Sequence, residues 1–330
     1  MKHGFVFGKF LPLHRGHLAL MDFARVRCAR LTVVVCASDR EPTAGELRRD
    51  WVAASMAAHP TVDVKLFSYA EAELPNTSVS SWEVSRRWAA AFQVLLPEVD
   101  GVFTSEPYGD YLAEWMGIVH VPFDPPRNQV PVSASLIRTA PMQYWEFLAP
   151  AARPFFVRKV AVVGTESTGK STLTAQLAHH FQTVFVPEAG RDLVPQTREC
   201  RWSDLDAIAV AQAQRIQQAL PAARRVLFSD TELLTTKSYA RFLFGCTLRV
   251  AGWVKESNKF DMYLYLSPDV PFVQDGTRLS ASDRLRLDAS HRAQLAEEGV
   301  DYRVIQGAWP DRFQQAVGWV EKSLLPSKAP

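Results

Sequence analysis

The stretch Gly164-Thr-Glu-Ser-Thr-Gly169-Lys170-Ser171 decides how the second half of this chain is interpreted. It follows the apolar run Val157–Val163, which predicts a buried strand, and it precedes Thr172–Phe181, whose apolar residues recur at helical spacing. A strand, a glycine-rich turn and a helix in this order are the context of a phosphate-binding P-loop. A chance match in a glycine turn is the alternative, but chance would not supply the flanking strand and helix. We therefore predict that this region binds a nucleoside triphosphate.

Each part of this motif has an expected task. The backbone from Gly164 to Gly169 would surround the phosphates with N–H groups at the start of a helix. Lys170 would reach the β- and γ-phosphates, and the Ser171 hydroxyl is placed to ligate Mg²⁺. The predicted nucleotide-binding residues are Gly164, Thr165, Glu166, Ser167, Thr168, Gly169, Lys170, Ser171 and Thr172.

Composition limits the classes of protein to which the chain can belong. A length of 330 residues suits two domains, and 47% hydrophobic with 22% charged residues is typical of a globular protein. A net charge of +2 does not favour a nucleic-acid or membrane partner. The four cysteines are far apart, without zinc or disulfide spacing. No apolar run is long enough to span a membrane and no signal peptide is recognisable, so we expect a soluble cytoplasmic protein.

The first half of the chain alternates between strand and helix patterns. Residues 3–8, a helix from Leu18 to about Arg30 and the strand 31–37 form a βαβ unit, which predicts a parallel sheet. The alternation then continues to a linker at Ala149–Pro154. The further expected elements are a helix to about Ala58 opened by a capping box at Thr43–Glu46, strand 62–67, helix 80–96, strand 101–104, a helix after Gly109, strand 118–121 and a helix from about Met142.

His14-Arg-Gly-His17 is the second chemical signal in the sequence. Two histidines three residues apart at a helix start face the same side, and Gly16 between them leaves room for a ligand. Imidazole N–H groups and the helix N-terminus suit the oxygens of a triphosphate. One histidine capping the helix while the other is exposed is the alternative, which the glycine-ended strand and the βαβ context disfavour.

The segment Gly8–His17 resembles the (H/T)xGH, here HxGH, signature of nucleotidyltransferases, and Val132–Arg138 resembles their second signature, a serine-rich helix start that ends on arginine. The pair implies a domain of Rossmann-like fold that transfers a nucleotidyl group from a triphosphate and releases pyrophosphate. The resemblance implies that Lys9, His14, His17 and Arg138 hold the triphosphate. Further implied nucleotide-binding residues are Gly8, Phe10, Gly16, Ser133 and Ser135.

The second half supplies further candidates around the P-loop. The apolar strand 226–231 ends in Asp230, the carboxylate expected to position the second phosphate site or its Mg²⁺, although an N-cap role remains an alternative. Glu188 and Arg191 follow the strand 183–186. After the strand 261–267, the segment that carries Arg278 and Arg284 is expected to be a mobile lid, as in small-molecule kinases. Further expected elements are helix 203–220, strand 302–305 and helix 311–325.

The order of these motifs resembles the bifunctional nicotinamide mononucleotide (NMN) adenylyltransferase and ribosylnicotinamide kinase family of the NadR type. The matching segments are Gly8–His17, Ser105–Gly109, Val130–Arg138, Gly164–Ser171, Pro187–Arg191, Asp230–Thr236 and Asp275–Arg278. The resemblance implies an α/β chain with a nucleotidyltransferase domain at 1–150 and a P-loop kinase domain at 151–330. The kinase would phosphorylate nicotinamide riboside with ATP and Mg²⁺, and the first domain would convert NMN and ATP to NAD and pyrophosphate.

Site roles follow from that likeness. Asp230 would orient or deprotonate the riboside hydroxyl, and Ser171 with Asp230 would hold Mg²⁺. Trp82 is a candidate for stacking on the nicotinamide ring, although a half-buried packing role is the commoner fate of such a residue. The implied substrate-binding residues are Trp82, Glu106, Tyr108, Glu188, Arg191, Asp230 and Thr231.

Two other functions remain open, and one family feature is missing. The same architecture could serve coenzyme A synthesis, by joining pantetheine-phosphate adenylylation to a kinase, or the chain could be a non-catalytic ATP-binding sensor. Regulatory members of the family carry an N-terminal DNA-binding helix-turn-helix, for which the strand at residues 3–8 leaves no room, so we expect small-molecule substrates and no nucleic-acid partner. A homo-oligomer is compatible with the sequence.

Overall fold

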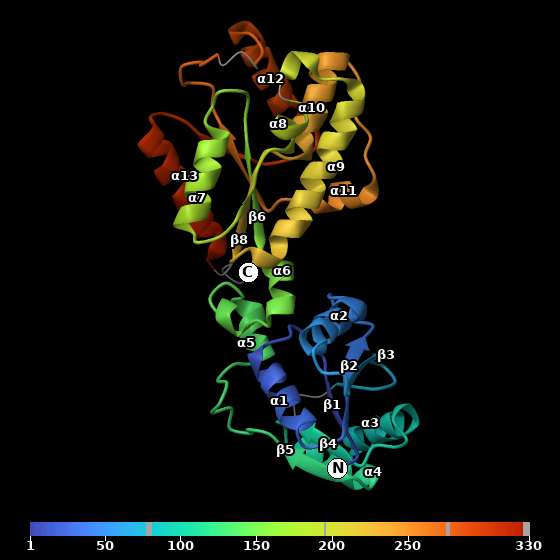
Figure 1. The fold of residues 1–330 in the computed structure, drawn as a ribbon. Coiled ribbons are helices and arrows are strands. Elements are labelled where there is room, and N and C mark those ends of the chain that lie inside the picture. The colour runs from blue at the N-terminus through green and yellow to red at the C-terminus, as the bar shows by residue number, and fades with distance from the viewer. Residues whose placement is uncertain (77–80, 195, 275–277, 326–330) are drawn as a thin grey trace. The chain divides into compact units, whose positions relative to one another are not determined.

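The computed structural model describes residues 1–76, 81–194, 196–274 and 278–325. The chain divides into two compact units, Met1–Phe155 (unit 1) and Phe156–Pro330 (unit 2), each built around its own sheet (Figure 1). The segment expected to be a linker forms helical turns, η2 (Pro150–Ala152) and α6 (Arg153–Phe156), and the division follows Phe155.

Unit 1 contains a parallel five-stranded sheet in the order β3-β2-β1-β4-β5. The strands are β1 (His3–Gly8), β2 (Arg30–Ser38), β3 (Val62–Tyr69), β4 (Gly101–Thr104) and β5 (Val119–Pro122). The helices are α1 (Arg15–Arg25), α2 (Gly45–Met56), α3 (Trp82–Leu95), α4 (Tyr108–Met116), α5 (Ala134–Thr139) and the short η1 (Trp145–Phe147). The direction of strand addition reverses between β1 and β4, which makes the carboxyl ends of these two strands the expected ligand site.

The sheet of unit 1 is buried on both faces. On one face, Phe5 and Val102 pack against Phe92 of α3 and Leu112 of α4. On the other face, the ring of Phe23 in α1 meets that of Phe103 at a centroid distance of 6.2 Å. Burial on both faces explains why the inner strands β1, β2 and β4 are mainly apolar, whereas the edge strand β3 alternates apolar and charged residues and is only half buried.

Unit 2 contains a second parallel five-stranded sheet, in the order β10-β9-β6-β8-β7. The strands are β6 (Arg158–Val163), β7 (Phe185–Val186), β8 (Val226–Asp230), β9 (Met262–Leu266) and β10 (Arg303–Ile305). The helices are α7 (Lys170–His180), α8 (Ala189–Leu193), η3 (Thr197–Glu199), α9 (Trp202–Ala219), η4 (Leu220–Ala222), α10 (Leu233–Phe244), α11 (Gly252–Ser257), α12 (Ala281–Glu297) and α13 (Trp309–Leu324). The predicted fold, two α/β domains with parallel sheets, is confirmed.

Helices cover both faces of the second sheet as well (Figure 1). Val160 and Val162 of β6 face Leu177 of α7 and Val320 of α13. The alternate residues of the same strand, with Tyr263 of β9, face α10 and α12. Strand β6 is therefore central, and the turn that follows it lies at the middle of the sheet edge.

Several expected element boundaries are wrong. Helix α1 begins at Arg15 and not at Leu18, because the His14 side chain caps it. The predicted capping box at Thr43 does not form: the N-cap of α2 is Ala44, without a side-chain bond. No α-helix begins near Met142, where turns lead to η1. Ser80 and Asp275–Thr277, which belonged to a predicted helix and to the predicted lid, lie outside the described residues.

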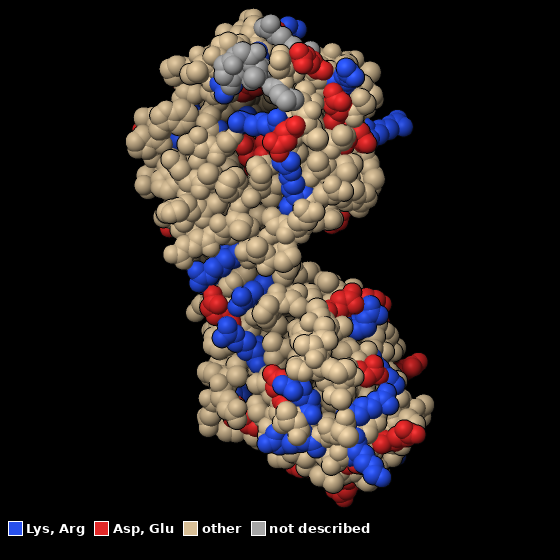
Figure 2. All heavy atoms as spheres, in the orientation of Figure 1, with Lys and Arg blue, Asp and Glu red and all other residues tan. Residues whose placement is uncertain are grey.

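Charges of both signs are mixed on the surface. On the face shown in Figure 2, basic and acidic side chains are interspersed, in keeping with a net charge of +2. Among the described residues, no helix has the length and apolarity required to cross a bilayer.

Candidate active sites

The P-loop, residues Gly164–Ser171, connects β6 to α7 as the sequence predicts. Gly164 has φ +138°, and a Cβ atom there would lie 2.6 Å from the Leu266 carbonyl oxygen, so the turn requires glycine. Gly169 has φ +85° and serves as the N-cap of α7. Lys170 is 7% exposed, and its ammonium donates to the Thr165 carbonyl at 3.0 Å, so the lysine curls back over its own loop. A glycine-rich turn at a helix N-terminus is the arrangement that phosphate-binding loops use.

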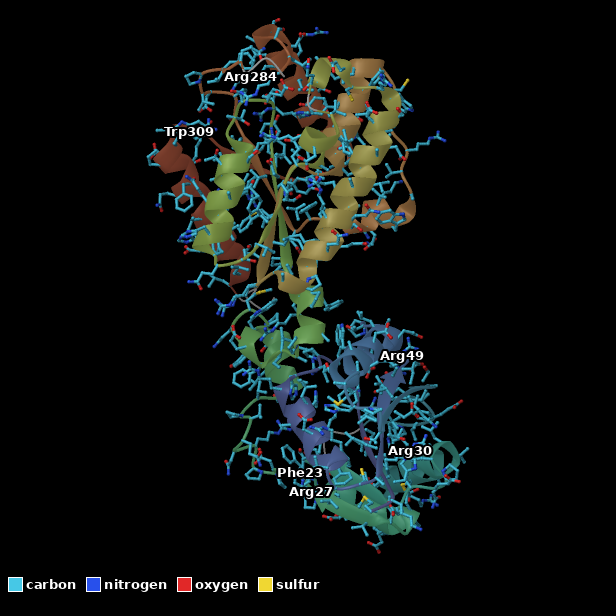
Figure 3. All side chains as sticks on the ribbon, in the orientation of Figure 1. Phe23, Arg27, Arg30, Arg49, Arg284 and Trp309 are labelled. Carbon is cyan, nitrogen blue, oxygen red and sulfur yellow. The ribbon has the colours of Figure 1, made fainter. Side chains whose placement is uncertain are left out.

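Two buried arginines hold the P-loop by its carbonyl groups. Arg284 lies on α12 (Figure 3). It donates to the Glu166 carbonyl at 3.1 Å and to the Ser167 carbonyl at 3.3 Å. Arg312 of α13 donates to the Thr168 carbonyl at 3.3 Å. With the carbonyls directed toward the arginines, the loop N–H groups are left to face a bound anion.

The position of Arg284 corrects the predicted lid. It lies in a 17-residue helix that packs on the sheet, and it is 5% exposed. Its guanidinium is occupied by backbone carbonyls, including that of Val270 at 3.1 Å. Arg278 lies in the non-helical segment before α12, donates to the Val273 carbonyl and lines the cavity beside the P-loop. The first turns of α12 are rich in charged and small polar residues, which is why the sequence predicts a polar segment there instead of a packed helix.

Asp230 and Ser171 meet at the carboxyl ends of the neighbouring strands β6 and β8. The Ser171 hydroxyl donates to Asp230 Oδ2, while Asp230 Oδ1 is buried without a hydrogen-bond partner among the described residues. Desolvation and the nearby Glu188 carboxylate raise the pKa of Asp230, and Lys170 partly opposes them. An N-cap role for Asp230 is ruled out, since Glu232 caps α10. The pair supplies the hard oxygen ligands that Mg²⁺ prefers, and the unpaired Oδ1 suits a cation ligand.

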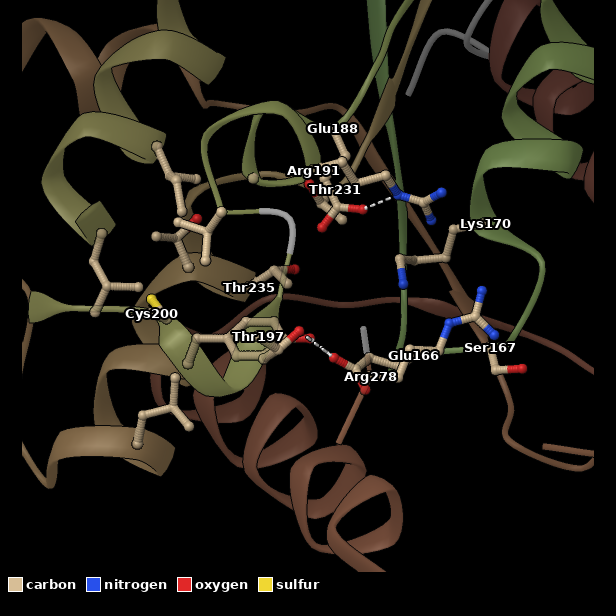
Figure 4. Close-up of a pocket in the computed structure, with 17 residues that line it drawn as sticks. Glu166, Ser167, Lys170, Glu188, Arg191, Thr197, Cys200, Thr231, Thr235 and Arg278 are labelled. Carbon is tan, nitrogen blue, oxygen red and sulfur yellow. Dashed lines mark hydrogen bonds and ion pairs between the residues drawn. The ribbon is translucent and has the colours of Figure 1, made fainter. Parts of the chain in front are cut away.

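A cavity of about 290 Å³ adjoins these groups and is called the P-loop cavity (Figure 4). Its polar side includes the Glu188–Arg191 ion pair at 2.9 Å and the P-loop residue Glu166, whose carboxylate accepts from the Thr197 hydroxyl at 2.9 Å. Its opposite side is apolar. The residues that line this cavity include the polar Lys170, Glu188, Arg191 and Thr231 and the apolar Leu205, Ile208 and Leu243.

The structure brings the predicted kinase residues together around the P-loop and its cavity, and it adds one residue that the sequence did not identify. Thr172 is exposed at the start of α7, outside the lining of the P-loop cavity, and its nucleotide contact stays a prediction. The Glu166 side chain faces this cavity, as its bond to Thr197 shows, rather than the inside of the loop. The sequence did not identify Gln212 of α9, which is buried and links the Ala189 N–H (2.8 Å) to the Ser229 hydroxyl (2.9 Å). A polar residue on the buried face of a long helix was the available signal.

In unit 1, the two histidines lie at the predicted reversal of the sheet. A cavity of about 300 Å³, called the histidine cavity, is lined by His14 and His17 together with the ends of β1 and β4. The two rings stack at a centroid distance of 3.6 Å, and Phe10 meets His17 edge-on. The absence of a side chain at Gly16 makes room for the His14 ring, since a Cβ there would lie 3.0 Å from that ring.

Both histidines are neutral near pH 7. Burial, with the Arg127 charge, lowers the pKa of His14 to about 4. Burial, followed by His14 and Arg127, places the pKa of His17 well below its usual value. Since His14 Nδ1 accepts from the Gly16 N–H at 3.1 Å, its one proton is on Nε2, which is a hydrogen-bond donor.

The second predicted signature is present at the rim of the same cavity. Ser133 caps α5 by accepting from the Leu136 N–H, and both Ser133 and Ser135 line the histidine cavity. Arg138 does not belong to this lining; it donates to the Leu11 carbonyl at 2.6 Å and the Ser135 hydroxyl at 3.0 Å. Arg138 therefore secures the loop after β1 in this structure, and its contact with the triphosphate stays a prediction.

Arg127 is the cation that the sequence missed in this cavity. It lines the histidine cavity and pairs with Glu106, a predicted substrate residue, at 2.6 Å. Its segment, Asp124-Pro-Pro-Arg127, contains no motif, and Arg127 adopts a positive φ of 56°. Only the fold brings it to the histidines.

A further cavity of about 200 Å³, the aromatic cavity, shares Gly8, Lys9 and Tyr108 with the histidine cavity. Its wall includes Tyr69 and Trp88, whose rings meet at 5.0 Å. The predicted stacking residue Trp82 does not line it. Trp82 is 41% exposed and packs against Tyr111 and Trp115 of α4. Trp88, further along α3, faces this cavity instead.

Comparisons with known proteins agree with this geometry. A family model described as an AAA domain matches residues 159–312. The trifunctional NAD biosynthesis/regulator protein NadR of Salmonella typhimurium (strain LT2) is 30% identical over 349 aligned positions, which cover 97% of this chain and 83% of the relative. The protein of the same description from Escherichia coli (strain K12) is 30% identical over 348 positions, with the same coverage.

Two solved structures share the fold over the whole chain. A NadR protein in complex with NR has a TM-score of 0.77 at 20% identity and covers 100% of this chain and 98% of its own. A NadR protein in complex with NAD and AMP-PNP has a TM-score of 0.78 at 20% identity and covers 100% and 97%.

Proposed function

The chain belongs to the family of the trifunctional NAD biosynthesis/regulator protein NadR, and on this premise we propose that its two units catalyse consecutive steps of NAD synthesis. Unit 2 phosphorylates the 5′-hydroxyl of nicotinamide riboside with ATP. Unit 1 then joins the product, NMN, to the adenylyl group of a second ATP. One observation supports this most: each unit contains a turn with a predicted phosphate-binding motif at a strand end, and a cavity adjoins it.

In unit 2, the residues divide between donor and acceptor. The P-loop N–H groups and Lys170 bind the β- and γ-phosphates of ATP. The riboside occupies the P-loop cavity, with its base toward Leu205, Ile208 and Leu243 and its ribose toward the Glu188–Arg191 pair. Asp230, whose pKa is raised, accepts the proton of the 5′-hydroxyl. The hydroxyl oxygen then bonds to the γ-phosphorus, and the bond from that phosphorus to ADP breaks.

Magnesium fits the same site. Ser171 and Asp230 would hold Mg²⁺, which would neutralise charge on the β- and γ-phosphates. One carboxylate oxygen of Asp230 cannot bind the metal and accept the proton at the same time, so the two roles fall to its two oxygens. Oδ2 contacts Ser171, and Oδ1 has no hydrogen-bond partner among the described residues. Thr231 follows with φ +65° and lines the acceptor side.

In unit 1, the acceptor phosphate is already a nucleophile at neutral pH, so alignment and charge stabilisation carry the reaction. The triphosphate lies in the histidine cavity, where neutral His14 donates through Nε2 and Arg127 adds positive charge. An oxygen of the NMN phosphate bonds to the α-phosphorus, and the bond to pyrophosphate breaks. The nicotinamide ring occupies the aromatic cavity, against Tyr69 and Trp88.

We also propose that the protein works in the cytoplasm on small molecules alone. The described cysteines are all free thiols, which fits a reducing compartment.

Glu106 and Tyr108, predicted to contact substrate, line the histidine cavity, and Tyr108 also lines the aromatic cavity.

Product analysis tests the proposal. The purified protein is incubated with Mg-ATP and nicotinamide riboside, and the products are separated by chromatography. NMN followed by NAD, with ADP and pyrophosphate formed in step, is the expected result. No use of the riboside, together with adenylylation of pantetheine phosphate in a parallel incubation, would instead favour coenzyme A synthesis. ATP binding without substrate-dependent ADP would favour a sensor.

A further inference from the structure

Lys9 lies where the two cavities of unit 1 meet. It lines both the histidine cavity and the aromatic cavity, and its side chain is 43% exposed. If the triphosphate occupies the first cavity and NMN the second, the reacting phosphates come together beside this residue. A lysine side chain there must be held in one direction to be useful, because a free lysine populates many rotamers.

Glu41 holds the Lys9 ammonium at 3.0 Å. The Glu41 carboxylate is only 7% exposed, and its second oxygen forms an ion pair with Arg48 at 2.6 Å and accepts from the Ser38 N–H at 3.2 Å. It is therefore a fixed anchor and not a mobile surface carboxylate. The contact is an ion pair, and Glu41 Oε1 accepts no hydrogen bond from the described residues, so the three N–H donors of the ammonium remain available to phosphate oxygens.

Arg48 fixes the other end of the same lysine. Its side chain is fully buried, and it donates to the Lys9 carbonyl at 2.7 Å and to the Cys36 carbonyl at 3.3 Å. One guanidinium from α2 thus connects the loop after β1, the end of β2 and Glu41. Arg48 thus contacts the Lys9 backbone directly and the Lys9 ammonium through Glu41. Burying a guanidinium carries a desolvation penalty, which these contacts offset.

We propose that Glu41, fixed by Arg48, is a positioning residue for adenylyl transfer: it directs the Lys9 ammonium to the junction of the two cavities. The inference rests on the adenylyl transfer proposed for unit 1. Glu41 touches no substrate and acts through Lys9. The competing explanation is that the Glu41–Arg48 pair only stabilises the fold of unit 1.

A double-mutant cycle separates the two explanations. Glu41→Gln, Lys9→Met and the double variant are compared by kcat/KM for NAD formation from NMN and ATP. Glu41→Gln should lower kcat/KM about tenfold in the unsubstituted protein and have no further effect beside Lys9→Met, because its only route is through the lysine. The same loss in both backgrounds, or no loss in either, overturns the proposal.

Controls distinguish loss of folding and loss of the parent reaction. Glu46→Gln, on the exposed side of the first turn of α2, should leave kcat/KM unchanged. If Glu41→Gln unfolds unit 1 in a thermal melt, Glu41→Asp replaces it, since the shorter carboxylate keeps a charge for Arg48 but retracts from Lys9, and the same criterion applies. Failure of the unsubstituted protein to form NAD would instead refute the proposed function.

Discussion

The His14 side chain has two separate tasks. Nδ1 accepts from the Gly16 N–H and so caps α1, while Nε2 carries the proton that we propose it donates to the triphosphate. His14→Asn should separate them, because asparagine can cap a helix but cannot reach as far with a donor. We expect adenylyl transfer to fall about 100-fold, the typical effect of losing one donor to developing charge, with unit 1 stability changed by less than about 1 kcal/mol.

Rates and thermal melts check this, with His14→Ala as the comparison. Alanine loses the cap as well as the donor and should reduce both activity and stability, the latter by about 1 kcal/mol. An asparagine variant that retained full activity would show that His14 is only a cap.

In unit 1, the site residues that lie within the two signature motifs could be predicted from the sequence. The histidines and serines lie within contiguous signatures, so their convergence followed from the βαβ pattern. The choice between Trp82 and Trp88 did not: they are six residues apart on α3, which turns them to different sides of the helix. Only the packing of α3 on the sheet decides which one faces the cavity.

At the scale of elements, α12 braces the P-loop. Arg284→Met removes the donors to three backbone carbonyls and leaves that of Glu166 buried without this donor, so it should destabilise unit 2 by about 3 kcal/mol while raising the KM for ATP. Arg286→Met, on the same helix but with a side chain 72% exposed, should change stability by less than about 0.5 kcal/mol. Urea unfolding and kinase assays measure both. A lid arginine would behave differently, lowering kcat at unchanged stability.

Helix α10 begins with a buried carboxylate that makes unit 2 sensitive to pH. Glu232 is 1% exposed and accepts from the N–H groups of Leu234 and Thr235, and burial raises its pKa to about 7. The folded protein thus binds this proton more tightly than the unfolded chain, whose glutamate has its ordinary pKa near 4.5. The stabilising contribution of the proton is therefore present at low pH and is lost as pH rises to about 7.

Glu232→Gln should remove that dependence. Urea unfolding at intervals from pH 4.5 to 8 should show a decline of up to about 3 kcal/mol for unit 2 in the unsubstituted protein, and a flatter curve in the variant. Glu256→Gln, at a side chain 69% exposed, is the control. Parallel curves for Glu232→Gln and the unsubstituted protein would contradict the assignment.

Over the whole molecule, the two sheets could be predicted because the sequence of each unit begins with a strand, a glycine-containing turn and a helix in immediate succession. The mistaken placement of Arg284 in a lid and the unnoticed Arg127 have a common cause: both depend on segments far apart in sequence meeting in space, which no local pattern records. Substrate identity came from likeness to a family and not from the residues alone, since one fold serves many substrates.

The two units should work independently. Each has its own sheet, core and site, so we expect a substitution in one site to leave the core and the site of the other unit unchanged. Lys170→Ala should abolish phosphorylation of nicotinamide riboside, at least about 100-fold, and leave NAD formation from supplied NMN nearly unchanged. His17→Ala should do the reverse. Each activity is assayed with its own substrate, and circular dichroism confirms folding. If either substitution in a folded protein removed both activities, the two reactions would have to share a site, and the division of labour between the units would be wrong.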